Sequence, residues 1–299
     1  MNKAELNTKN PACNKEISVE GLQILGSGKN GDVYRIDKEK VVKIYRKHYG
    51  ISKIHKEFLF ASLCREAGIP AMKPYEIVKY RASYGIIYER LNGISVKELL
   101  INEPEKVETF AALHACFMRE NHRITLTQDY GLSARGITTE WLEQIPIFSI
   151  TERNAIQTAL ETIPDRMCLL HMDPLPANLL LLSPGHFAWI DLEDGRIGHP
   201  VYSLQNLFCP DFIGHVSGFS RHTTNVLRKY WEYFAQYYFE GTEKKRIPGI
   251  LRGIRFIAYL RFIFLQLKIA GDTPLFRMQT GLLKETLFRD YNSGLDFYW

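Results

Sequence analysis

The chain has 299 residues, 45% of them hydrophobic and 24% charged, which excludes a largely disordered protein and allows a substantial core. Its net charge of +5 fits an anionic ligand such as a nucleotide but is too small to predict binding of nucleic acid. The five cysteines are widely spaced and include no CxxC pair, which argues against a disulfide framework or a zinc site and favours a reducing cytoplasm.

Residues 1–16 are polar and lack the apolar run of a signal peptide, so we expect a flexible tail on a cytoplasmic protein. Short runs rich in Val, Ile and Tyr follow at 21–47, broken by GSGKNG and DKEK. This pattern predicts three antiparallel strands.

The segment 52–68 carries start and stop signals of a helix. Ser52 is the predicted N-cap, and Gly68 ends the segment shortly before Pro70. Two further strand-like runs cover 75–81 and 84–91, so the first part of the chain reads β-β-β-α-β-β.

The rest of the chain is mainly helical, with two short strands near its middle. The strands are CLLHMD and HFAWID, and the predicted helices cover 107–121, 152–163, about 221–240, 247–270 and 275–290. We therefore predict an α+β fold with two lobes. The N-terminal lobe, 17–92, has a small antiparallel β-sheet and one helix, and the C-terminal lobe, 93–299, is larger and mainly helical.

The most apolar segment, 256–271, is short for a membrane span and contains Arg261 and Lys268, so we predict no membrane span. We favour a helix buried within the protein. A helix lying in a membrane interface is the alternative.

The string GSGKNGDVY places Gly26, Gly28 and Gly31 in a GxGxxG pattern followed by Val33. A strand follows the glycines, whereas a dinucleotide-binding fold would continue with a helix. A glycine-rich hairpin of this kind closes over phosphates, because glycine lets backbone N–H groups approach the oxygens. An ordinary glycine-rich turn is the alternative.

Lys43 lies on the third predicted strand and shares a face with Val41 and Tyr45. From there it can reach beneath the glycine loop, and Glu57 on the following helix is its candidate partner. The alternative is that both are ordinary solvated side chains.

The string HMDPLPAN places Asp173 five residues before Asn178, the spacing of a phosphotransfer loop in which the aspartate accepts a hydroxyl proton. Asp191 ends an apolar strand thirteen residues after Asn178. Asn178 and Asp191 could provide the oxygen ligands that Mg²⁺ prefers. The alternative is two polar turns bonded to the backbone. His171 is either a base or, as we favour, a buried ring bonded to the backbone.

This ordered set resembles the protein-kinase-like superfamily and is most similar to its aminoglycoside phosphotransferase/choline kinase branch. That branch typically has HGDLHPGN and then an IDW segment, where this chain has HMDPLPAN and IDLEDGRIGHP. Pro176 and Asn178 fall at the family's positions, and the resemblance spans roughly residues 21–209. It implies a bilobal protein-kinase-like fold and phosphoryl transfer from ATP, with Mg²⁺, to a hydroxyl of a small molecule.

The resemblance also implies roles for individual residues. The loop Gly26–Gly31 and Lys43 would hold the nucleotide phosphates, with Glu57 paired to Lys43. Adenine would meet the backbone of a hinge formed by Tyr88, Glu89 and Leu91. Asp173 would orient or deprotonate the acceptor hydroxyl, and Asn178 and Asp191 would hold Mg²⁺.

Several positions depart from the family pattern. Met172 replaces a glycine, Pro174 and Leu175 replace Leu-His, and DLE stands where protein kinases have DFG. His199 and Ser203 replace two aspartates that often anchor the loop, which affects the expected local geometry more than the chemistry. A protein-modifying kinase and a non-catalytic nucleotide-binding module are the alternative functions.

Overall fold

The computed structural model describes residues 15–208, 210 and 221–299, with side chains from residue 224 onward in the last range. Within these ranges the chain forms two compact units. The first consists of Met1–Ile94, as far as it is described, and Leu180–Asp194; the second consists of Ser95–Leu179 and Gly195–Trp299. Most of the predicted tail lies outside the described residues, and the division at 92/93 stays a prediction.

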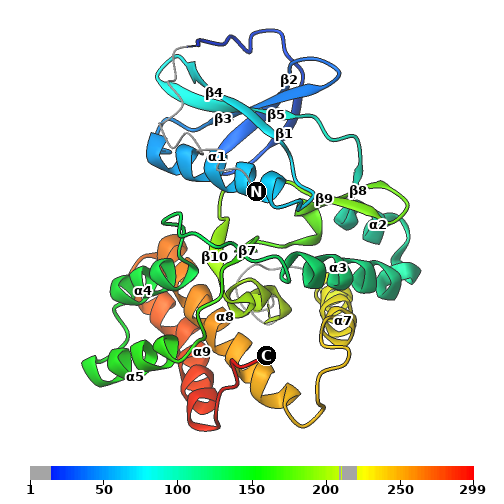
Figure 1. The fold of residues 1–299 in the computed structure, drawn as a ribbon. Coiled ribbons are helices and arrows are strands. Elements are labelled where there is room, and N and C mark those ends of the chain that lie inside the picture. The colour runs from blue at the N-terminus through cyan, green and yellow to red at the C-terminus, as the bar shows by residue number, and fades with distance from the viewer. Residues whose placement is uncertain (1–14, 209, 211–220) are drawn as a thin grey trace. The chain divides into compact units, whose positions relative to one another are not determined.

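The first unit contains a five-stranded antiparallel sheet (Figure 1). Its strand order is β1-β2-β3-β5-β4. The strands are β1 (Ile24–Ser27), β2 (Gly31–Arg35), β3 (Lys40–Tyr45), β4 (Pro74–Tyr80) and β5 (Ser83–Glu89). The predicted order of five strands and one helix is confirmed.

The helix of this unit, α1 (Ile51–Glu66), packs against β4 and β5. The prediction that Ser52 is the N-cap of this helix is wrong. Gly50 occupies the cap position in an extended conformation and its carbonyl accepts the Lys53 N–H, which places Ser52 inside the first turn. The end of the helix is as predicted, because Gly68 takes a positive φ of 79° and donates to the Arg65 carbonyl.

Alternation along β3 sends neighbouring side chains to opposite faces of the sheet. Val42 and Ile44 join a buried cluster with Val19, Val78 and Ile87. Lys43 therefore projects to the other face, where α1 supplies its partner Glu57.

Two small sheets complete the β-structure. One has the order β6 (Ile94–Ser95), β8 (Leu179–Ser183) and β9 (His186–Trp189). The other pairs β7 (Cys168–Leu170) with β10 (Arg196–Gly198) in antiparallel register. The strand predicted at CLLHMD ends at Leu170, because its partner β10 is only three residues long.

The second unit is mainly helical, as predicted. Its α-helices are α2 (Val96–Asn102), α3 (Val107–Asn121), α4 (Ala134–Gln144), α5 (Ile150–Glu161), α7 (Arg221–Tyr238), α8 (Ile247–Ala270) and α9 (Pro274–Asn292). Short 3-10 turns lie at η1 (Pro104–Lys106), η2 (Pro176–Asn178), η3 (Pro200–Tyr202) and η4 (Leu204–Phe208).

Packing within this unit is dominated by the pairs α3–α7 and α8–α9 (Figure 1). In α8, Phe256, Ile257, Leu260 and Ile263 are all buried, which confirms a buried helix and contradicts the interfacial alternative. No helix in the described residues is long and apolar enough to cross a membrane.

Two matching hydrogen bonds fix α3 against α7. His114 Nδ1 lies 2.7 Å from the Tyr230 hydroxyl, and His122 Nδ1 lies 2.7 Å from the Tyr238 hydroxyl.

Candidate functional site

The predicted site residues fall into two groups, one in each unit, and each group is described by itself. In the first unit, the glycine string forms the β1–β2 hairpin. Gly28 N–H donates to the Gly31 carbonyl at 2.8 Å, and Val33 pairs with Lys43 on β3. A Cβ at Gly31 would lie 2.3 Å from the Ile44 carbonyl oxygen, so the close approach of β2 to β3 requires glycine there.

Lys43 is surrounded by three carboxylates of the same unit. Its Nζ lies 3.3 Å from Glu57, 2.7 Å from Asp191 and 3.1 Å from Glu193. Burial disfavours the ammonium ion, but these three carboxylates outweigh that effect and hold the pKa of Lys43 above its ordinary value. Lys43 is therefore a fixed cation, and the predicted pairing with Glu57 is present.

Glu57 is buried, and Tyr88 supports it from β5. The Tyr88 hydroxyl donates to the same Glu57 oxygen at 2.8 Å. Burial and the neighbouring Glu57 carboxylate raise the pKa of Tyr88 well above its ordinary value, so the phenol keeps its proton. Tyr88 is fully buried and thus reaches the site through Glu57.

The other two residues of the predicted hinge, Glu89 and Leu91, lie at the end of β5 and just beyond it. Glu89 is its last residue, and its N–H donates to the Lys73 carbonyl at 2.8 Å. Leu91 follows beyond the end of the strand, where the backbone is not engaged in the sheet.

Asp191 lies two residues after Trp189, the last residue of β9. It has a φ of 55°, an uncommon value for a residue other than glycine and one that occurs often at functional sites. Its side chain is 46% exposed although it is bonded to Lys43. The carboxylate thus has a free face for a second charged group.

Two contacts of the first unit were not predicted. Glu193 contacts Lys43 and accepts a hydrogen bond from Asn30 at the tip of the glycine hairpin. Burial, followed by the nearby carboxylates, raises the pKa of Glu193 despite Lys43. Asn30 lies inside the GxGxxG string, so its place in the glycine hairpin could have marked it as a candidate site residue.

In the second unit, Asp173 and Asn178 lie together as the sequence spacing predicts. Asn178 Nδ2 donates to the Asp173 backbone carbonyl at 2.9 Å and to its Oδ2 at 3.3 Å. Both partners are pure acceptors, which fixes the orientation of the amide. These bonds use the nitrogen of Asn178 and turn its oxygen, the atom suited to a cation, the other way.

The loop around Asp173 is held by its own backbone and by His171. The Leu175 N–H donates to the Asp173 carbonyl at 2.8 Å, and the Asn178 N–H donates to the Leu175 carbonyl at 2.8 Å. His171 is buried, and its Nδ1 accepts the Asp173 N–H at 3.2 Å. The backbone-bonded interpretation of His171 is therefore confirmed.

Side chains from distant segments also contact this loop, and sequence reasoning missed them. Ser203 donates to the His171 carbonyl at 2.8 Å, and Gln205 donates to the Met172 carbonyl at 2.7 Å. Arg261 of α8 donates to the same Met172 carbonyl. A partial signal existed for Ser203, which occupies an expected anchoring position.

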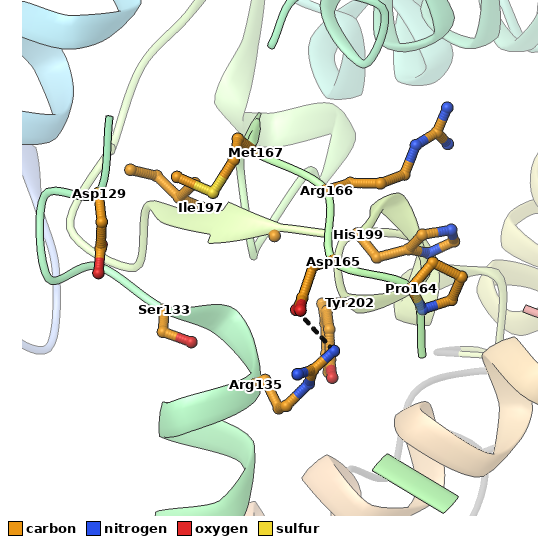
Figure 2. A pocket seen from close by; sticks show the side chains of 11 residues that line it. Asp129, Ser133, Arg135, Pro164, Asp165, Arg166, Met167, Ile197, His199 and Tyr202 are labelled. Atoms are coloured by element: carbon orange, nitrogen blue, oxygen red, sulfur yellow. Dashed lines mark ion pairs between the residues drawn. The ribbon is translucent and has the colours of Figure 1, made fainter. Parts of the chain in front are cut away.

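A pocket of about 210 Å³ lies within the second unit and contains none of the predicted site residues (Figure 2). Its lining includes Met167 and Gly198, at the end of the β7–β10 pair away from the Asp173 loop. Arg135 and Asp165 form an ion pair of 2.8 Å at its wall. His199 also lines it; burial and Arg166 lower the pKa of its ring to about 4, so it is neutral near pH 7.

The described residues contain no group of three or more His, Cys, Asp or Glu side chains placed to hold a metal ion. The Asp191 carboxylate and the Asn178 amide oxygen are ligands of the type that Mg²⁺ accepts together with substrate phosphates. Taken separately, each of these oxygens has the chemistry of a ligand for a metal that is also bound by phosphate.

The fold is shared with several solved phosphotransferases. A thermostable mutant of aminoglycoside phosphotransferase APH(4)-Ia, in a ternary complex with AMP-PNP and hygromycin B, matches with a TM-score of 0.60 at 15% identity. The match covers 92% of this chain and 95% of that one. The ethanolamine kinase of Plasmodium vivax matches with a TM-score of 0.56 at 14% identity, covering 90% and 84%.

Amicoumacin kinase hAmiN, in complex with AMP-PNP, Ca²⁺ and Ami, matches with a TM-score of 0.55 at 14% identity, covering 95% of this chain and 93% of that one. These likenesses confirm the bilobal protein-kinase-like fold class. No curated protein sequence matches the chain. The model of the phosphotransferase enzyme family matches residues 21–239, which is more than half of the chain, and the chain therefore belongs to that family.

Proposed function

We propose that the protein transfers the γ-phosphate of ATP to a hydroxyl group of a small molecule, with Mg²⁺ as the metal. The observation that carries this proposal is the pairing of Lys43 with buried Glu57 and with Asp191, in a member of a phosphotransferase family. An ordinary surface lysine would have neither partner.

The first unit provides the nucleotide site. The hairpin Gly26–Gly31 covers the phosphates with backbone N–H groups, and Val33 packs beside the base. Lys43 neutralises phosphate oxygens, oriented by Glu57 and, through Glu57, by Tyr88. The backbone from Glu89 to Leu91 meets adenine.

The charge around Lys43 supports a metal. Three carboxylates surround one ammonium group, which leaves a surplus of negative charge that a divalent cation offsets. Asp191 and Asn178 would hold Mg²⁺, which when bound shields the phosphate charge and stabilises the leaving diphosphate.

Asp173 orients the acceptor hydroxyl and accepts its proton. The hydroxyl oxygen forms a bond to the γ-phosphorus, and the bond from that phosphorus to the oxygen of ADP breaks. The Asn178 amide nitrogen holds Asp173 by donating to both its backbone carbonyl and its carboxylate. Catalysis then rests mainly on positioning and charge neutralisation.

The names of the structural neighbours support a small-molecule acceptor. Their names include an aminoglycoside phosphotransferase, an ethanolamine kinase and an amicoumacin kinase, all acting on small molecules. We expect an aminoglycoside, choline, sugar or amino alcohol type of acceptor, and a reaction in the cytoplasm, where ATP is available.

The test is ATP consumption by the purified protein with Mg²⁺ against a panel of aminoglycosides, choline, ethanolamine, sugars and nucleosides, and against casein. Product is identified by mass spectrometry. We expect one small-molecule class to be phosphorylated, and Asp173→Asn to lower kcat at least about 1,000-fold while ATP still binds. Asp165→Asn is the control, because Asp165 is a 90% exposed carboxylate of the same unit.

Labelling of casein or of the protein itself, without small-molecule turnover, would indicate a protein kinase instead. ATP binding without any transfer would indicate a non-catalytic nucleotide-binding module. Full activity of Asp173→Asn would remove Asp173 from the mechanism.

A further inference from the structure

The peptide unit that joins Met172 to Asp173 is held at both of its polar ends. Its N–H group, which belongs to Asp173, donates to His171 Nδ1 at 3.2 Å. Its carbonyl, which belongs to Met172, accepts from Gln205 Nε2 at 2.7 Å and from Arg261 Nη1. A peptide unit is planar, so these three bonds fix its orientation, and with it the start of the Asp173 side chain.

The two carbonyl donors are unusual in their burial. Gln205 is fully buried and Arg261 is only 8% exposed. A buried guanidinium is costly unless it is paired, and arginine is seldom found in such a place without a specific role. The guanidinium carbon of Arg261 also lies 5.9 Å from the centre of the Trp141 ring, a second contact that restricts the position of the group.

The backbone carbonyl of His171, the residue before Met172, is also held by a side-chain donor. Ser203 donates to the His171 carbonyl at 2.8 Å, at a position where the family usually has an aspartate. An aspartate could only accept hydrogen bonds, whereas Ser203, Gln205 and Arg261 all donate to backbone carbonyls of the loop. In this chain the loop is thus held by donors to its carbonyls.

We propose that Arg261 and Gln205 are positioning residues that set the orientation of the Asp173 carboxylate by holding the Met172 carbonyl. This inference rests on the proposed function of Asp173. Arg261 contacts no reacting atom, so its loss should lower kcat and leave the KM for ATP nearly unchanged.

The test compares Arg261→Met, Arg261→Lys and Gln205→Leu with the control Arg252→Met. Arg252 lies on the same helix and donates to the Gly294 carbonyl, so its replacement removes the same charge and a bond of the same kind. Transfer kinetics are measured with the acceptor found in the screen. Amide hydrogen exchange of the loop 171–178 is measured by mass spectrometry and needs no acceptor.

We expect Arg261→Met and Gln205→Leu to lower kcat by about 100-fold, the effect of misplacing a catalytic group by about 1 Å, and to speed exchange in the loop. Arg261→Lys should recover part of both, because lysine keeps a donor but lacks the planar group. Arg252→Met should change neither quantity. If Arg261→Met does not fold, the other two variants carry the test.

Wild-type kcat and loop exchange in all folded variants at Arg261 and Gln205 would overturn the positioning role while leaving the proposed function intact. If instead the wild-type protein transfers no phosphate to any acceptor, the proposed function fails. Faster loop exchange in the variants would then show only that Arg261 and Gln205 hold the backbone.

Discussion

The ammonium group of Lys43 lies 2.7 Å from a carboxylate oxygen of Asp191, a residue 148 positions further along the chain. Glu57 approaches the same group from α1, at 3.3 Å. One carboxylate is buried and the other is 46% exposed, so the first serves to hold the lysine and the second remains accessible.

The burial of Glu57 predicts a stability effect at Lys43. Lys43→Met leaves a buried carboxylate without its cation and should lower the free energy of unfolding by about 3–5 kcal/mol. Adding Glu57→Gln should restore part of the loss, because the amide carries no charge. Denaturant unfolding measures both, with exposed Lys40→Met on the same strand as the control. Additive losses in the double variant would contradict the pairing.

The two glycines at either end of the hairpin should differ in their tolerance of alanine. Gly31→Ala places a Cβ 2.3 Å from the Ile44 carbonyl oxygen and should destabilise the unit by about 1–3 kcal/mol. Gly26→Ala meets no atom within 4 Å and should stay within about 0.5 kcal/mol of the wild type. Thermal unfolding distinguishes them, and equal shifts would argue against the close approach of β2 and β3.

The orientation of the Asn178 amide predicts a change in metal dependence. Asn178→Ala removes one proposed oxygen ligand and the N–H groups that hold Asp173. The Mg²⁺ concentration that gives half-maximal transfer should rise by about 10–100-fold. Titration of the rate with Mg²⁺ checks this, with exposed Asn225→Ala on α7 as the control. An unchanged titration would exclude Asn178 as a metal ligand.

Two buried histidines, His114 on α3 and His122 immediately after it, predict acid sensitivity. Burial lowers the pKa of both His114 and His122 to about 3, whereas an unfolded histidine titrates near 6.5. The unfolded chain therefore binds protons that the native protein excludes between about pH 6.5 and pH 3. Stability is complete above this range and falls as the pH drops through it, by up to about 1.4 kcal/mol per pH unit for each histidine.

Replacing one of these histidines should flatten that dependence. His122→Gln keeps a hydrogen-bonding partner for Tyr238 and removes one titrating ring. Between pH 7 and pH 4, the free energy of unfolding measured with denaturant should fall less steeply for His122→Gln than for the wild type or for exposed His48→Gln. A slope equal to that of the wild type would show that His122 does not bind a proton on unfolding.

The elements of the fold were predictable because they rest on local patterns. Period-two runs located β3 and β5, and the helical period of 107–121 coincides with α3 (Val107–Asn121). Spacing also brought Asp173 and Asn178 together, since a loop of six residues keeps its ends close. Ser52 is not the cap because the helix begins one residue earlier, at Ile51, which leaves Gly50 in the cap position.

The tertiary contacts of the site could not be predicted in this way. Arg261 lies 89 residues from Met172, and nothing in the sequence of α8 distinguishes it from the other basic residues of that helix. The contacts of Glu193 with Asn30 and Lys43 also join residues that are far apart in the sequence, so no local pattern predicts them. The positive φ of Asp191 likewise depends on tertiary contacts, because the residue is not a glycine and its type therefore does not indicate this conformation.

The position of Leu180–Asp194 in the chain affects the order in which the first unit can be completed during synthesis. This segment belongs to the first unit, although the chain enters it from the second. On the ribosome, Lys43 and Glu57 can meet early, but the partners Asp191 and Glu193 arrive 148 and 150 residues after Lys43. The sequence of the N-terminal unit therefore stays incomplete until Ser95–Leu179 of the helical unit has been made, so Lys43 and Glu57 wait for two of their partners while the ribosome synthesises part of the other unit.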